Sequence, residues 1–216
     1  MTSRLIAAGC PAAPLVSLFI VLFATAPHTA AAESDGRSPT QVVQTFHEVL
    51  IESLKQSDTL DYEGRTELIR PVFVKTLDMN FMAEKSAGRD WKTFNDEQKQ
   101  QWIEAFSKHT LANYASRFKG FSGQNFETHG EEEALSNTIV VKTTLIDPGG
   151  DDVQLNYRLR ETPDGWRVID IYVHGTVSEL ALRRAEYSAA IGRDGIDSTI
   201  TQLQKQTQDL SVKADN

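Results

Sequence analysis

The 216-residue chain carries 30 acidic and 22 basic side chains, which leaves a formal net charge of −8 at pH 7. This acidic balance, without a dense cluster of Lys and Arg, argues against nucleic acid as a partner. The one cysteine, Cys10, excludes a disulfide framework. An apolar core must therefore hold the fold together, and the length suffices for one such core.

The N-terminus has the pattern of a secretory signal peptide. Arg4 precedes an apolar run over 15–24, and the small residues Ala30–Ala32 follow. The run is too short for a membrane span, which needs about 20 apolar residues. An uncleaved anchor is the alternative. We predict that residues 1–32 are a signal peptide and that residues 33–216 form a single α+β domain.

Helical patterns begin the predicted domain. Ser38 and Gln41 have the spacing of a capping box. They open a helix whose apolar stripe consists of Val42, Phe46, Val49, Leu50 and Leu54. Shorter helical pieces are predicted over 65–81, with an interruption at Pro71, because proline lacks the amide hydrogen that a helix interior needs.

A second capping box, Asn95 with Gln98, opens a long helix that Gly120 and Gly123 end. Its predicted buried side consists of Trp102, Ile103, Phe106, Leu111, Tyr114 and Phe118. Two further helices, over 178–191 and 195–207, are predicted to close the chain, with frayed residues from Ser211 onward.

Between these helical regions lie β-patterned runs joined by short turns. Phe126 is placed on a first strand, and three runs follow over 138–146, 153–160 and 166–173. The middle run alternates with a period of two, its apolar face being Val153, Leu155, Tyr157 and Leu159. In the last run Ile169, Ile171 and Val173 are predicted to share one face. We expect an antiparallel meander.

The predicted fold class is α+β, with a curved antiparallel sheet covered by helices and an apolar cavity between sheet and helices. Twelve side chains are predicted to line this cavity. They are Phe73, Phe81, Trp102, Phe106, Tyr114, Val141, Val153, Leu155, Tyr157, Leu159, Ile169 and Ile171. Spacing alone would also fit an ordinary core, so the pattern does not by itself identify a ligand.

The strongest catalytic candidate is a base formed by Asp170 with His174 as its orienting group, as in a small isomerase or dehydratase. Four residues apart on a strand, the two side chains would be about 13 Å apart, unless the chain turns between them. The alternative is that Asp170 pairs with Arg158 or Arg160 across the sheet, while His174 caps a loop.

No metal-ligand spacing, nucleophile motif or phosphate-binding loop occurs in the sequence, so no metal or cofactor is expected. The run Glu131–Glu133 has two interpretations, a docking patch or a solvated loop.

A series of short motifs, in order and spacing, resembles the toluene-tolerance family of MlaC-type periplasmic lipid carriers. The motifs are Asp78–Phe81, Gly88–Trp91, Asn95–Gln98, Tyr114–Phe118, Gly165–Asp170, His174–Ser178 and Arg193–Asp197. The resemblance spans about residues 40–204. The stretch Gly175–Arg184 is more similar still to the hopanoid-associated HpnM branch of that family.

The resemblance implies an NTF2-like cone whose apolar cavity takes the tails of a phospholipid or hopanoid. It implies a soluble periplasmic carrier of an ABC-type transport system, which exchanges lipid with membrane-bound complexes of the inner and outer membranes. No catalytic residue and no cofactor follow from it. The isomerase that uses Asp170 and His174 is the alternative function.

The signal-peptide assignment predicts the N-terminus of the exported protein. Cleavage after Ala32 would remove Arg4, the only charged side chain of residues 1–32, and the product would begin at Glu33. N-terminal sequencing of protein from the envelope of its host measures this. Recovery of residues before Pro27 in a membrane fraction would contradict the prediction.

Overall fold

The computed structural model describes residues 1–2 and 36–214. The predicted signal peptide and its cleavage site therefore lie outside the described residues. Within those ranges, no helix combines the length and the apolarity needed to cross a membrane. The elements are α1 (Pro39–Lys55), α2 (Tyr62–Thr76), α3 (Met79–Ala87), η1 (Asp90–Thr93), α4 (Asp96–Arg117), β1 (Asn125–Ala134), β2 (Thr138–Ile146), β3 (Val153–Thr162), β4 (Gly165–Val173), β5 (Val177–Ser178), α5 (Glu179–Asp194) and α6 (Ile196–Ala214).

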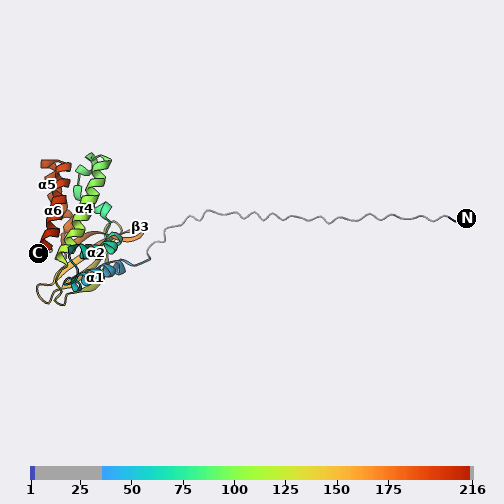
Figure 1. Ribbon diagram of the computed structural model, residues 1–216, viewed down its shortest axis with the longest axis horizontal. Coiled ribbons are helices and arrows are strands. Elements are labelled where there is room, and N and C mark those ends of the chain that lie inside the picture. The colour runs from blue at the N-terminus through green and yellow to red at the C-terminus, as the bar shows by residue number, and fades with distance from the viewer. Residues whose placement is uncertain (3–35, 215–216) are drawn as a thin grey trace. The chain divides into compact units, whose positions relative to one another are not determined.

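The predicted α+β class and the antiparallel meander are confirmed. The strands form one sheet in the order β1-β2-β3-β4-β5, and each pairs antiparallel with its neighbour in the chain. Helix α1 packs on β1, β2 and β4, while α2, α3 and α5 pack on β4. In Figure 1, α4 and α6 lie side by side, and α6 also packs on α5.

Both predicted capping boxes are formed. The Ser38 hydroxyl accepts from the Gln41 amide at 3.2 Å, and the Gln41 side chain accepts from the Ser38 amide at 2.8 Å. Asn95 and Gln98 repeat this arrangement at the start of α4. Reciprocal capping satisfies amides that the first helical turn leaves without partners. The two helix starts are therefore determined locally, and the apolar stripe that follows each start decides which side is buried.

The predicted break at Pro71 is wrong, because α2 continues through it. Pro71 is exposed, and it costs the helix only the hydrogen bond that its missing amide would have made. On the other side of the helix, Ile69, Val72 and Phe73 are buried in the core. This packing outweighs one lost hydrogen bond, since burial of a large apolar side chain contributes about 1.5–3 kcal/mol.

Two further boundaries differ from the sequence prediction. Glu131–Glu133 is not a loop: it lies on β1, where Glu132 pairs with Lys142 of β2 at 2.6 Å. Because β1 is an edge strand, its charges discourage edge-to-edge association with other chains. Helix α6 extends to Ala214 rather than ending at Thr207.

A β-bulge on β4 changes which residues face the core. Arg158 of β3 lies opposite Asp170, but the next residue of β3, Leu159, lies opposite Val168, so Ile169 has no partner on β3. The prediction that Ile169 shares one face with Ile171 is therefore wrong. Val168 belongs to the core cluster and Ile171 packs against it, whereas Ile169, although buried, does neither. An extra residue in one strand shifts the two-residue period by one position.

Asp78 links the α2–α3 turn to the sheet. Its carboxylate accepts from the Phe81 amide at 3.0 Å, which caps α3, and from the guanidinium of Arg160 at 2.9 and 2.6 Å. Its own amide donates to the Val168 carbonyl at 2.9 Å. Arg160 also lies over the Phe81 ring, 4.4 Å from the centroid. The Asp78 carboxylate thus positions both the start of α3 and the Arg160 side chain of β3.

This double role predicts a graded loss of stability. Asp78→Ala removes the cap and the ion pair, and we expect it to lower the free energy of unfolding by about 1.5–2.5 kcal/mol. Asp78→Asn keeps a good cap and loses only the charge, so its loss should stay below about 1 kcal/mol. Urea unfolding of both variants measures the difference. Equal losses would show that the cap contributes nothing.

Candidate functional site

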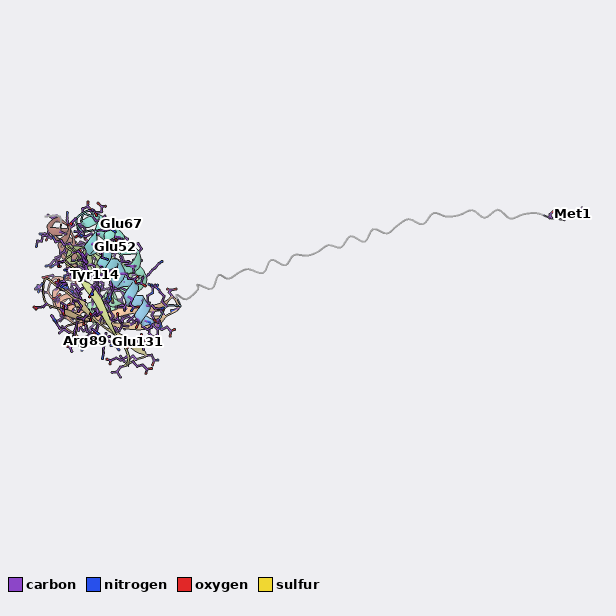
Figure 2. The ribbon with its side chains drawn as sticks, turned by 90° about the horizontal axis from the view of Figure 1, so that it is seen from below. Met1, Glu52, Glu67, Arg89, Tyr114 and Glu131 are labelled. Carbon is purple, nitrogen blue, oxygen red and sulfur yellow. The ribbon has the colours of Figure 1, made fainter. Side chains whose placement is uncertain are left out.

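A cavity of about 170 Å³ lies between β3 and β4 on one side and helices α3, α4 and α5 on the other. Its interior is mostly apolar. The apolar and aromatic lining is Leu77, Met82, Phe106, Tyr114, Phe118, Leu155, Tyr157, Ile171, Val173, Leu180 and Tyr187. Figure 2 labels Tyr114 amid the side chains of the folded unit, with Glu67 and Glu131 at opposite margins.

The polar part of the lining comes from α4 and from the start of α5. It consists of His109, Thr110, Asn113, Arg117, Glu179 and Arg183. Arg183 pairs with Glu186 at 3.0 Å and approaches Glu179 at 3.8 Å. Arg117 is exposed, and no carboxylate of the described residues lies within ion-pair distance of it. The cavity therefore combines an apolar interior with a charged rim that carries a free guanidinium.

His109 contributes no positive charge to this rim at neutral pH. Burial, and then the charges of Arg183 and Arg117, lower its pKa from the ordinary 6.5 to about 4. Its ring nitrogen Nδ1 lies 3.1 Å from the Thr207 hydroxyl of α6. The imidazole thus acts as a neutral link between α4 and α6 rather than as a cation that could bind an anion.

The structure brings five of the twelve predicted pocket residues onto this cavity. They are Phe106, Tyr114, Leu155, Tyr157 and Ile171. Four others, Phe73, Trp102, Val141 and Leu159, lie in the core cluster behind it. Phe81 is covered by Arg160 instead, while Val153 and Ile169 lie outside the core cluster. Whether the five cavity residues contact a ligand stays a prediction.

The sequence prediction missed the wall that α5 supplies. Leu180, Arg183 and Tyr187 all line the cavity, and their spacing of three and four places them on one face of a helix. That spacing could have identified the face. The local pattern, however, does not predict that this face covers the ends of β3 and β4. The position of α5 depends on where the chain leaves the sheet.

The proposed pairing of Asp170 with His174 is not formed. The buried Asp170 carboxylate accepts from the amides of Ile171 at 2.8 Å and Leu180 at 3.1 Å, and from the Ser178 hydroxyl at 2.6 Å. His174 is exposed in the turn between β4 and β5, with a positive φ of 51°. A carboxylate so engaged holds the start of α5 in place, and no hydrogen bond joins it to His174.

The alternative pairing of Asp170 with an arginine is also wrong. Arg158 donates to the Thr138 hydroxyl and to the Leu135 carbonyl, each at 2.9 Å. Arg160 is held by Asp78. Asp170 and Arg158 are opposite in register, but the bulge beside them turns the carboxylate toward β5 and α5. Backbone amides and a hydroxyl satisfy this carboxylate in place of a cation.

Comparison with known proteins identifies the family. The family model described as MlaC protein matches residues 44–205, about three quarters of the chain. The chain belongs to the MlaC protein family. A solved structure from Ralstonia solanacearum, described as a phospholipid-binding protein in complex with a phospholipid, is similar in fold. Its TM-score is 0.71 at 22% sequence identity, and the match covers 81% of this chain and 99% of that one. No curated protein matches the chain.

In this MlaC family chain, a second buried histidine lies behind the cavity. His47 of α1 stacks on Phe126 at 3.6 Å between centroids and meets the edge of Tyr157 at 5.1 Å. Neither of its ring nitrogens has a hydrogen-bond partner in the described part of the chain. Burial lowers the pKa of His47 from 6.5 to about 3. The ring is therefore neutral in the folded protein across the physiological range.

The buried neutral His47 predicts a pH dependence of stability. The unfolded chain binds a proton at this residue near pH 6.5, and the folded chain binds it only near pH 3. The stabilisation is complete above pH 6.5 and is lost as the pH falls toward 3, at about 1.4 kcal/mol per pH unit. Removing the titration with His47→Phe should reduce the slope between pH 6.5 and 5 by that amount, as measured by urea unfolding.

The exposed His129 supplies the matched control for this experiment. His129→Gln removes a histidine from β1 without changing the interior, and its slope should equal that of the unaltered protein. A His47→Phe variant that keeps the full slope would show that His47 is protonated in the folded chain.

Proposed function

We propose that this chain is a lipid carrier that binds the tails of a phospholipid in the cavity between α4, α5 and the sheet. The observation that carries the proposal is an apolar cavity with a charged rim in a chain of the MlaC family. Support comes from the Ralstonia solanacearum protein of similar fold, which was solved with a phospholipid. An apolar interior suits acyl tails, and a rim with a free Arg117 guanidinium suits an anionic headgroup.

The hydrophobic effect alone can hold such a ligand. Apolar surface removed from water contributes about 25 cal/mol per Å², so two buried acyl chains would contribute well over about 10 kcal/mol before the costs of association. No metal ion is needed, and among residues 1–2 and 36–214 no cluster of three metal-binding side chains occurs. Release then depends on a partner that offers the tails another apolar environment.

Binding requires the cavity to enlarge. Its volume of about 170 Å³ is close to that of a cavity that holds a single benzene ring, about 150 Å³. Helix α5 is the wall best able to move, because only Tyr187 and Ile191 of its 16 residues are buried. Elements with few buried contacts open at low cost. We infer that α5 pivots about its first turn, which Asp170 anchors, so that Arg183 and the turns beyond it move outward to admit the tails.

We infer that the chain works in the periplasm as the soluble component of an ABC-type system and exchanges lipid with complexes of both membranes. The HpnM-like stretch Gly175–Arg184 forms β5 and the start of α5, next to the cavity. This stretch is where cargo selection would act, so a hopanoid is the alternative to a phospholipid. Mass spectrometry of the bound lipid distinguishes the two.

Carboxylates placed in the cavity test this proposal. Leu155→Asp or Ile171→Asp should reduce copurified lipid to below about a tenth, because a charge in an apolar pocket costs several kcal/mol or draws in water. His174→Ala, in the exposed turn, should leave the lipid content unchanged. The measurement is lipid per mole of folded protein after organic extraction and mass spectrometry.

The matched control is Leu135→Asp, the same substitution at a side chain that is 85% exposed. It should retain the lipid content of the unaltered protein. Circular dichroism confirms that each variant is folded before lipid is compared. Folded cavity variants that keep their lipid, together with loss of lipid in His174→Ala, would place the binding site elsewhere.

A further inference from the structure

The cavity contains tyrosine hydroxyls that have no hydrogen-bond partner. Tyr114, Tyr157 and Tyr187 all line it, and within residues 36–214 none of the three hydroxyls is hydrogen bonded. Only His47 and Thr76 of the described residues have polar atoms that lack both a partner and accessible surface. The three hydroxyls therefore keep accessible surface, and all three residues line the cavity.

These unsatisfied groups are unusual in an apolar interior. A buried hydroxyl without a partner costs about 1–3 kcal/mol, and phenylalanine would supply the same ring without that cost. Tyr157 is 1% exposed, so bulk water does not reach it from the molecular surface. Buried polar groups that lack protein partners are typical of sites that a ligand completes.

Tyr114 and Tyr157 differ in how deeply they are buried below the rim of the cavity. Arg117 is exposed, and Tyr114 lies about one helical turn before it on α4, half-buried; both line the cavity. Tyr157 lines the same cavity but is only 1% exposed. The polar groups therefore run from Arg117 and Glu179 at the rim to Tyr114 and then to Tyr157.

The same order of polarity describes a glycerophospholipid. Its phosphate is anionic, two ester carbonyl oxygens follow, and the hydrocarbon tails come last. Ester carbonyls accept hydrogen bonds, which tyrosine hydroxyls donate. With the phosphate at the rim guanidinium, the ester carbonyls reach the depth of the two hydroxyls, and the tails extend into the apolar remainder of the cavity.

We propose that the hydroxyls of Tyr114 and Tyr157 donate hydrogen bonds to the ester carbonyls of a glycerophospholipid, so that the chain selects ester-linked lipids. This inference rests on the proposed lipid-binding function and adds the part of the lipid that is recognised. A diether lipid with the same headgroup and tails lacks the carbonyl acceptors, so its binding leaves both hydroxyls unsatisfied. The site therefore discriminates between two lipids of equal apolar surface.

A competition experiment measures this selection. The protein is incubated with vesicles of equal parts diester and diether phosphatidylglycerol with matched tails, then re-isolated, and its lipid is extracted and quantified by mass spectrometry. Each hydrogen bond corresponds to a preference of about three- to tenfold, so the two together predict a preference of about ten- to hundredfold for the diester lipid. Tyr114→Phe and Tyr157→Phe should each lower the ratio, and the double variant should return it to about one.

Tyr172→Phe is the matched control, since Tyr172 lies on β4 but does not line the cavity. It should keep the preference of the unaltered protein. Uptake of both lipids in the vesicle ratio by the unaltered protein would overturn the inference and leave lipid binding standing. A preference that persists in the double variant would also overturn it. Uptake of neither lipid would overturn the proposed function and this inference together.

Discussion

The hydrogen bonds of the Asp170 carboxylate determine where α5 leaves the sheet, and the course of α5 creates the cavity. Three donors, the amides of Ile171 and Leu180 and the hydroxyl of Ser178, converge on this buried group. Charge-assisted bonds of this kind are about twice as strong as neutral ones. They hold the first turn of α5 above the ends of β3 and β4 instead of letting it collapse onto the sheet. The apolar face beneath α5 thus stays partly unfilled.

The rest of the site consists of polar groups placed where a protein core would ordinarily avoid them. Tyr114 and Tyr157 line an apolar cavity, and within residues 36–214 neither their hydroxyls nor the ring nitrogens of His47 have a hydrogen-bond partner. Each such group lowers the stability of the empty protein by about 1–3 kcal/mol. A binding protein can tolerate this cost, because a ligand restores stability by mass action when it occupies the site. The proposed lipid binding would therefore raise the stability of this chain.

Local chemistry explains why so much of the fold could be predicted. The two capping boxes at Ser38 and Asn95 begin helices without reference to the rest of the chain. The two-residue period of β3 and the turns beside it required an antiparallel meander, and the structure has one. Pro71 was misjudged because the packing of its helix, which no local pattern reveals, outweighs the loss of one hydrogen bond.

The sequence by itself determined the α+β class, the positions of most helices and strands, and membership of the MlaC family. It also placed Tyr114 and Tyr157 among the cavity residues. Only the tertiary structure decided which apolar residues are core and which line the cavity. The bulge at Ile169 shifted the inward face of β4, and α5 supplied a wall with Leu180 that the prediction had left out. The physical reason is that periodicity defines a face, whereas a cavity depends on the distance between two faces, and long-range contacts set that distance.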